Sequence, residues 1–491
     1  MNLEKRDMKE KLTHVYMMLM LGLFPLWVGW SGYSNLTAQK YGFFTAATVL
    51  CLALLLVCAL RERDLRFQLT AGQRAVCALT AGLCLSALCS PYGADTLVGA
   101  GRYDGLVTWG LYAAIFWGVS RYGRFRLSQA YALAAGSLVN CAVAVVQLMG
   151  YNCLWLFPGE LTYYDAGTAY TGEFLGLIGN VDVLAACFCL TIPLFLGLYV
   201  TLGGRQTAPL AAAAGLNFFI LLESGVAGGL AGLLLAVLVG APMVLTDRER
   251  LSRGLTALAV LALSAAASQA AVFSENGVRI ELCKLFWLLL CAGGLLAVCG
   301  HFLCRAAVRL ENPGIKLAVL ELLCVIAALA ALYAVPPASG TLGELSMLLH
   351  GQVSDTFGSN RVTIWKEVWG LIRERPILGG GPDTLRLRTE LTFSRYAETG
   401  TKLTVHLDNA HNEYLNLWVN GGLVSLVPYL ALIAATLRRW RQHRGHPMLA
   451  PLMLALAAWW GQALFGLGLC ILMPLLWILW GLAWSMPKDC L

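Results

Sequence analysis

The sequence predicts an all-α polytopic integral membrane protein with about 14 (12 to 14) transmembrane helices and one large extracytoplasmic loop. Of its 491 residues, 58% are hydrophobic and only 13% are charged, whereas soluble domains carry about 25% charged residues. The apolar residues also form runs of about 20, the length that a helix needs to cross a bilayer. Together these observations exclude a single soluble globular protein.

Polar residues and Gly or Pro breaks separate the candidate spans. We expect helices 1–11 in residues 1–335, a large extracytoplasmic loop in 336–412, and helices 12–14 in 413–491. Basic residues precede the first apolar run without a convincing cleavage site, so we expect a retained first helix. The spans cover residues 15–33, 42–60, 72–90, 105–120, 128–149, 174–200, 207–222, 226–245, 255–273, 284–304, 317–335, 413–436, 450–467 and 469–486.

The cations of the chain predict its orientation. With a cytoplasmic amino terminus, the inner segments contain 23 of the 35 Lys and Arg residues, and the outer connections contain 12, eight of them in the long loop. Because the positive-inside rule counts short loops only, the relevant comparison is 23 against 4. We therefore expect both termini in the cytoplasm and the long loop outside. The net charge of +7 then reflects topology and says little about a binding partner.

One segment of the long loop has the pattern of an amphipathic helix. Between Ser359 and Glu374, one apolar stripe recurs at spacings of three and four, formed by Val362, Trp365, Trp369 and Ile372. Ser359 or Asn360 is a candidate N-cap, and Pro376, followed by glycines, ends the helix. Such a helix either lies in the membrane interface or packs on top of the helix bundle.

Histidine is the side chain most readily used as a base near neutral pH. Of the seven histidines, three are expected outside, namely His350, His406 and His411. His411 belongs to the polar segment 408–415, D-N-A-H-N-E-Y-L, where the loop re-enters the membrane. Such a cluster costs insertion free energy unless it is paired or lines a wet cavity. The simpler interpretation is that Asp408 or Asn409 caps the next helix and His411 is an interfacial hydrogen-bonding residue.

The charges of the loop exclude several classes of site. Its eight cations are balanced by eight acidic residues, so bulk charge does not favour a nucleic acid. The outer side has no D-x-D, D-x-E or E-x-D pair, and a divalent cation that holds a diphosphate normally needs paired carboxylates. Glycines 379–381 lack the Lys-Ser/Thr of a P-loop. An outward-facing reaction would therefore use arginine charge and a histidine base, without a metal or other cofactor.

A second polar cluster lies in the predicted span 174–200. Residues 176–185 read G-L-I-G-N-V-D-V-L-A, which places Asp182 about eight residues inside the span, or roughly 12 Å of helix rise. An ionisable group at that depth is a candidate for function, and pairing with a neighbouring helix is the structural alternative. Glu223 and Glu321 are weaker cases of the same kind.

The order of these motifs resembles the O-antigen ligase and O-antigen polymerase superfamily of bacterial cell-surface glycan enzymes. The resemblance rests on Gly176, Gly179, Asn180, Leu184 and Ala185, on Arg361 with Trp365, on P-I-L-G-G-G at 376–381, and on H-N-E-Y-L at 411–415. Its specific motifs cover residues 174–200 and 360–425, while the rest of the chain agrees in topology. The expected architecture is similar to that of GT-C-like glycosyltransferases.

The resemblance implies a metal-independent glycosyltransferase of the bacterial cytoplasmic membrane that acts in cell-envelope polysaccharide biosynthesis. It would move a glycan from a polyprenyl-diphosphate carrier, such as undecaprenyl diphosphate, to a hydroxyl of a glycan, lipid or protein acceptor at the outer face. His411 is similar to the catalytic histidine of the family, and Arg361 to the loop arginine assigned to the diphosphate. We also expect substrate contacts from Asn180, Asp182, Asn412, Trp365, Lys366, Arg279 and Tyr414.

One departure from the family pattern concerns the break between the two mid-chain spans. Many members carry Ser-Arg-Gly there, with the arginine as a second diphosphate ligand, whereas residues 223–226 of this chain read E-S-G-V. Either Arg279, Arg102 or Lys366 takes its place, or the diphosphate is held less firmly, or activity is altered or lost. The alternative functions are a transporter, such as a lipid-linked oligosaccharide flippase, and an inactive assembly partner.

Overall fold

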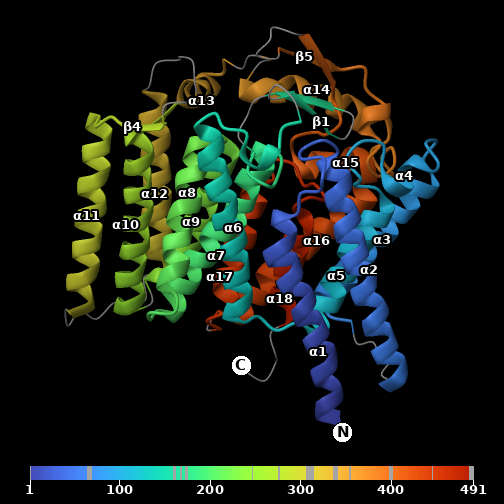
Figure 1. Cartoon of the computed structure of the whole chain (residues 1–491), viewed down its shortest axis with the longest axis horizontal. Coiled ribbons are helices and arrows are strands. Elements are labelled where there is room, and N and C mark those ends of the chain that lie inside the picture. The colour runs from blue at the N-terminus through green and yellow to red at the C-terminus, as the bar shows by residue number, and fades with distance from the viewer. Residues whose placement is uncertain are drawn as a thin grey trace.

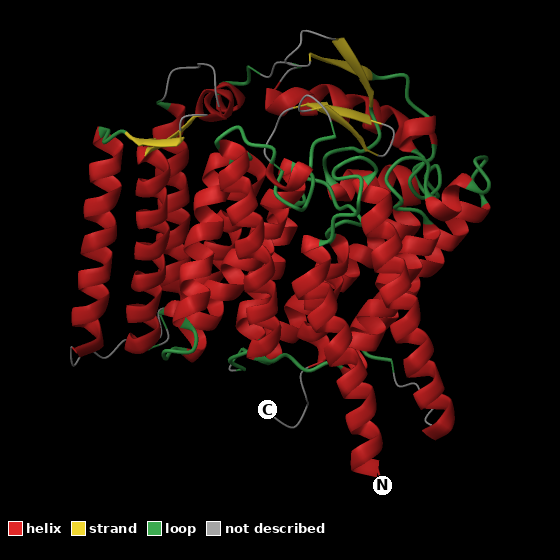
Figure 2. Cartoon of the chain, in the orientation of Figure 1, coloured by secondary structure: helices red, strands yellow, loops and turns green. Residues whose placement is uncertain are grey.

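The structure, a computed structural model, consists of helices with three short β-hairpins (Figures 1 and 2). Figure 2 shows the long helices side by side and the strands at one end of the bundle. In Figure 1, α13 and α14 lie over that same end, and the start of α1 lies at the opposite end. The described residues are 2–62, 69–158, 162–165, 168–171, 175–245, 247–274, 277–305, 314–334, 341–352, 355, 357–396, 402–444 and 446–485.

The first part of the bundle contains a broken helix. The chain leaves α1 through a π-helical turn (Leu19–Leu23) and a 3-10 turn (Phe24–Leu26). The buried Lys40 ammonium donates to the carbonyl oxygens of Phe24 and Pro25 at 3.3 and 3.1 Å, so it pairs backbone groups that the break releases. The helices here are α1 (Asn2–Met18), α2 (Leu36–Glu62), α3 (Ala71–Leu88), α4 (Asp95–Val98), α5 (Leu106–Tyr122) and α6 (Leu127–Leu148).

Among the described helices that are long and apolar enough to cross a membrane, α7 is the most enclosed: its apolar stretch is 89% buried, against 17% for α2. The C-terminal tryptophans Trp459, Trp477 and Trp480 are fully buried in the core of the bundle, so they are packing residues. The remaining bundle helices are α7 (Val181–Leu202), α8 (Ala208–Glu223), α9 (Ala227–Val244), α10 (Arg248–Ala270), α11 (Lys284–Arg305), α12 (Gly314–Tyr333), α16 (Leu423–Gln442), α17 (Leu449–Gln462) and α18 (Met473–Ser485).

The helices support a polytopic membrane protein. Among the described residues, eight helices are long and apolar enough to cross a membrane, and α8, α17 and α18 are shorter apolar helices. Most predicted spans agree with helices to within a few residues, as residues 207–222 do with α8. The total of 14 spans and the cytoplasmic position of the termini stay predictions.

Three predicted spans have the wrong boundaries. In place of the span 15–33, α1 begins at Asn2 and ends at Met18, and only a π-helical and a 3-10 turn continue it to Leu26. The span 174–200 begins only at Val181, because Gly176 and Gly179 adopt positive φ and form a turn, so Asp182 lies in the first helical turn and not eight residues deep. The span 413–436 is divided at Gly422 into α15 (Glu413–Gly421) and α16. Apolar runs conceal such breaks, since the turn residues are themselves apolar or glycine.

The connections at one end of the bundle contain strands, so the all-α prediction is incomplete. The hairpins pair β1 (Thr162–Asp165) with β2 (Thr168–Thr171), β3 (Ala271–Ser274) with β4 (Gly277–Ile280), and β5 (Thr392–Tyr396) with β6 (Lys402–His406), all antiparallel. The long loop also carries α13 (Thr341–Leu349), α14 (Phe357–Glu374) and a 3-10 turn (Leu385–Leu387). Strands of four or five residues give too little periodicity to be recognised in sequence.

The break at Gly422 provides a test of this architecture. Gly422 has φ +69°, and a Cβ there would lie 2.1 Å from the carbonyl oxygen of Ile377. We expect Gly422→Ala to destabilise the protein by at least about 1–3 kcal/mol, the usual cost of such strain. Gly370→Ala is the matched control, because a Cβ at that helical position meets nothing within 4 Å. Thermal unfolding in detergent should show a lower midpoint for Gly422→Ala only; equal midpoints for both variants would contradict the analysis.

Candidate functional site

His411 lies in the short segment between β6 and α15, at the end of the bundle that carries the hairpins. It adopts a left-handed conformation with φ +48°, which is uncommon for a residue other than glycine. Its backbone N–H donates to Oδ1 of the buried Asn409 at 2.9 Å. The indole Nε1 of Trp365 donates to the carbonyl oxygen of Ala410 at 3.1 Å. Neighbouring side chains therefore hold the backbone at Ala410 and His411, and with it the position from which the imidazole extends.

The cap of α15 is neither Asp408 nor Asn409, which corrects the simpler interpretation of this segment. Asn412 is the N-cap: its Oδ1 accepts the N–H of Leu415 at 3.0 Å. Its Nδ2 donates to the carbonyl oxygen of Leu464 at 3.0 Å. These bonds use the side chain of Asn412 structurally, and its role in substrate binding stays a prediction.

Arg361 begins the regular part of α14. Gly358, Ser359 and Asn360 all have positive φ, so the first turn is irregular, and neither Ser359 nor Asn360 has the extended conformation typical of an N-cap. The guanidinium of Arg361 donates from Nη1 to the carbonyl oxygen of Gly358 at 2.6 Å and from Nε to that of Phe465 at 3.1 Å. Two backbone acceptors therefore orient this cation.

The buried face of α14 differs from the predicted stripe. Ile364, Val368 and Ile372 are buried against residues of the same loop and of α15, whereas Trp369 is 45% exposed. The Trp369 ring packs edge-on against Trp418 at 5.5 Å between ring centroids. The helix thus packs on the protein, as one of the two sequence interpretations proposed.

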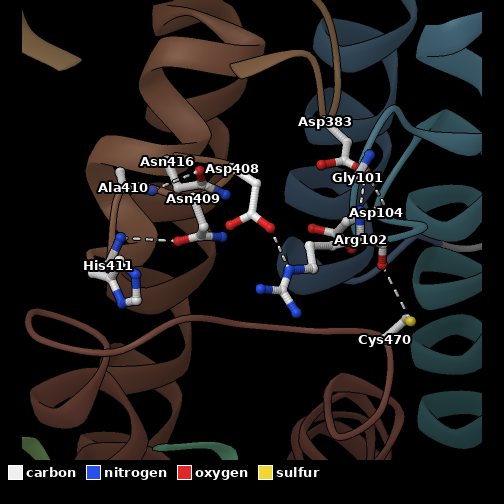
Figure 3. A network of polar contacts seen from close by, with 10 residues as sticks. All are labelled: Gly101, Arg102, Asp104, Asp383, Asp408, Asn409, Ala410, His411, Asn416 and Cys470. Carbon is white, nitrogen blue, oxygen red and sulfur yellow. Dashed lines mark hydrogen bonds and ion pairs between the residues drawn. The ribbon is translucent and has the colours of Figure 1, made fainter. Parts of the chain in front are cut away.

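The loop between α17 and α18, residues 463–472, contacts several parts of the site. Besides Leu464 and Phe465, its Gly468 N–H donates to Oε2 of Glu413 at 2.8 Å. Cys470 Sγ lies 3.4 Å from the carbonyl oxygen of Arg102. Figure 3 shows the ribbon that carries Cys470 passing beneath His411 and Arg102. This loop joins α14, α15 and the segment before α5.

Arg102 approaches the site from the connection between α4 and α5. Its Nε donates to Oδ2 of Asp408 at 2.7 Å, in an ion pair whose side chains are 11% and 9% exposed. The carboxylate of Asp383 accepts the backbone N–H groups of Gly101, Arg102 and Asp104 at 3.3, 2.9 and 3.3 Å. Figure 3 shows Asp383 pointing at this backbone and Arg102 extending toward Asp408.

Asn180 and Asp182 lie at the start of α7. Asn180 is the N-cap, with Oδ1 accepting the N–H of Val183 at 3.1 Å. Asp182 follows in the first turn, where a carboxylate is favoured by the helix dipole. Of the charged residues that act on the pKa of His411, Asp182 has the largest effect. Asp182 therefore lies within electrostatic range of His411, at a helix end, and the substrate contacts predicted for Asn180 and Asp182 stay predictions.

The charges around His411 set its protonation. Burial lowers the pKa of His411 below its ordinary value of 6.5. Among the neighbouring charges, Asp182 has the largest effect and raises this pKa, and Arg361 has the next largest and lowers it. Asp408 and Arg102 have smaller effects: Asp408 raises the pKa and Arg102 lowers it. The imidazole is therefore neutral at neutral pH, the form that accepts a proton.

Other predicted residues lie elsewhere or have structural partners. Lys366 pairs with Asp355, and both side chains are 68% exposed. Arg279 is exposed on β4. The hydroxyl of Tyr414 donates to the carbonyl oxygen of Trp460 at 2.9 Å. The substrate contacts predicted for these residues stay predictions.

The acidic residues Asp104 and Asp383 were missed in the sequence. Burial, Glu413 and Asp383 raise the pKa of Asp104 well above its ordinary value, and the Tyr112 hydroxyl donates to its carboxyl oxygen at 3.2 Å. Burial also raises the pKa of Asp383 to about 6, although the backbone N–H groups that donate to its carboxylate lower this pKa. A usable signal was the polar G-R-Y-D-G segment at 101–105, directly before an apolar span.

The O-antigen ligase family model matches residues 285–430, from α11 into α16. No curated protein matches the chain. The matched segment contains both Arg361 and His411, and the family implies glycan transfer of the O-antigen ligase type with lipid-linked glycan and acceptor substrates in a membrane. The match over residues 285–430 supports the resemblance of this chain to the O-antigen ligase superfamily.

Proposed function

We propose that the protein transfers a glycan from a polyprenyl-diphosphate carrier to an acceptor hydroxyl at the outer face of the bacterial cytoplasmic membrane. The observation that carries this proposal is the convergence on one neutral histidine, His411, of the oriented Arg361 and the carboxylate of Asp182. These elements supply a base, a cation for an anionic leaving group, and a charge that tunes the base. The family match is consistent with this chemistry.

In the proposed reaction, a neutral ring nitrogen of His411 accepts the proton of the acceptor hydroxyl. The acceptor oxygen forms a bond to the anomeric carbon of the donor sugar as the bond from that carbon to the phosphate oxygen breaks. The electron pair of the broken bond stays on the polyprenyl diphosphate. In-line attack opposite the leaving group inverts the configuration at the sugar carbon.

Arg361 would stabilise the negative charge that develops on the diphosphate. Its two backbone bonds hold the guanidinium in one orientation before substrate arrives, and such preorganisation is the main source of electrostatic stabilisation in catalysis. Arginine also matches the geometry of phosphate oxygens by bidentate hydrogen bonding. The proposed reaction therefore uses arginine charge in the place that a metal ion occupies in other enzymes.

Substitution of the proposed base and cation tests this function. We expect His411→Ala to lower transfer by roughly 10²–10⁴-fold, the usual contribution of a general base. Arg361→Ala should lower transfer strongly as well, because the leaving group loses an oriented cation. The measurement is product formation by purified full-length protein given a lipid-linked glycan donor and acceptor, with membrane insertion checked in parallel.

His406→Ala is the matched control, because this histidine is exposed at the end of β6 in the same loop. It should transfer glycan at the wild-type rate. Wild-type transfer by both His411→Ala and Arg361→Ala would overturn the assignment. Accumulation of the lipid-linked glycan on the inner face of a deletion strain would instead support a flippase.

The pH dependence of transfer tests the role of Asp182. Because His411 must be neutral to act as a base, activity is lost as the pH falls through its pKa. That acid limb should lie below pH 6.5, since burial lowers the pKa. Asp182→Asn removes the charge that most raises this pKa, so the limb should move to lower pH.

Asp355→Asn is the control for the pH profile, because Asp355 is an exposed carboxylate paired with Lys366. Its acid limb should coincide with that of the wild type. An acid limb that stays in place or moves to higher pH in Asp182→Asn would show that Asp182 does not set the protonation of His411.

A further inference from the structure

A diphosphate that links a lipid to a sugar carries negative charge on both phosphates, and it gains more when the bond to the sugar breaks. One guanidinium carries a single positive charge, so Arg361 alone leaves this anion under-compensated. The break between α8 and α9 does not supply an arginine, because it reads Glu223-Ser224-Gly225-Val226. Glu223 accepts a hydrogen bond from Ser268 at 2.6 Å. A second cation must come from another element.

The sequence leaves Arg279, Arg102 and Lys366 as candidates for this second cation, and their positions in the structure distinguish them. Lys366 is held in an exposed pair with Asp355, and Arg279 lies exposed on β4. Arg102 alone among these three is held against the segment that carries His411, through its 2.7 Å bond to Asp408. Arg102 and Asp383 also line a small cavity of mixed polarity, together with Asn409, Asn416 and Asn420 and with apolar residues.

We propose that Arg102 is the second cation of the diphosphate site, supplied by the loop between α4 and α5 in place of the arginine absent at residues 223–226. This inference rests on the proposed function, since it concerns the same donor. Arg361 and Arg102 then reach the site from different parts of the chain, one from α14 and one from the α4–α5 loop.

The backbone around Arg102 is built to place its side chain. Asp383 accepts three backbone N–H groups of residues 101–104, and the N–H of Ala100 donates to the carbonyl oxygen of Asp383 at 3.1 Å. Gly99 has φ +106°, and a Cβ there would lie 2.1 Å from Oδ2 of Asp383. None of these backbone contacts uses the side chain of residue 102. A substitution at this position therefore leaves the bonds between Asp383 and this backbone in place and removes the side-chain contact to Asp408.

The ion pair with Asp408 raises the alternative that Arg102 only holds that carboxylate. The two roles predict opposite effects of Asp408→Asn. If Arg102 binds the diphosphate, neutralising Asp408 removes a competing anion, so affinity stays equal or rises. If Arg102 only positions Asp408, then Arg102→Ala and Asp408→Asn should be equally harmful.

The experiment measures binding of undecaprenyl diphosphate and undecaprenyl monophosphate to the full chain in mixed micelles. Arg102→Ala should lower diphosphate affinity by on the order of tenfold to hundredfold, the usual effect of losing a charge-assisted contact. The loss should be smaller for the monophosphate, which has fewer charges to satisfy. Arg102→Lys keeps the charge without the planar fork and should bind with intermediate affinity.

Arg373→Ala is the matched control, because Arg373 is an exposed arginine in the last turn of α14 with no predicted substrate contact, and this variant should bind like the wild type. Melting temperatures establish that each variant is folded, and Arg102→Lys replaces Arg102→Ala if the latter is not. Wild-type diphosphate affinity in Arg102→Ala, or a loss in Asp408→Asn or Arg373→Ala equal to that in Arg102→Ala, would overturn the proposal. Failure of the wild type to bind either lipid would overturn the proposed donor itself, and this inference with it.

Discussion

The site depends on one constraint: backbone groups that leave regular helices at the end of a membrane bundle must still be hydrogen-bonded. The turn before α7 shows how this is met. Gln147 Oε1 accepts the N–H groups of Leu175 and Gly176, both at 2.9 Å, and Asn140 Oδ1 accepts that of Leu177 at 2.8 Å. The polar side chains of α6 thereby fix where α7 begins. They also fix where Asp182 lies.

The same constraint operates around His411, where the partners come from distant parts of the chain. Asp383 holds the segment before α5, Asn412 joins the start of α15 to the α17–α18 loop, and the N–H of Glu413 donates to the carbonyl oxygen of Ala463 at 2.8 Å. Buried charges without opposite partners are costly, so Asp408 lies beside a cation, and Asp383 and Glu413 accept backbone N–H groups. Satisfying the backbone thus assembles a charged site.

The sequence predicts the helices well and the site in part. Apolar runs locate most helices because burial in lipid demands about 20 apolar residues, and the loop pattern singles out His411 and Arg361, whose roles stay predictions. The depth of Asp182 was wrong because glycines in an apolar run do not reveal a turn. The buried face of α14 was also wrong, since Trp369 fits the helical period yet stays largely exposed. Arg102 was one of three possible substitutes, because its partner Asp408 lies 306 residues away in sequence.

The family match and the site cover different parts of the chain, and this difference has a physical meaning. Residues 285–430 supply the proposed base and the first cation. Asp182, Arg102 and the α17–α18 loop lie outside this segment, yet they determine the charge around His411 and the backbone that supports Arg361. The matched segment therefore contains the proposed reacting groups, but not all the residues that set their protonation and complete their charge. Those properties come from the first half of the bundle and from its last two helices, so the proposed chemistry belongs to the whole membrane domain.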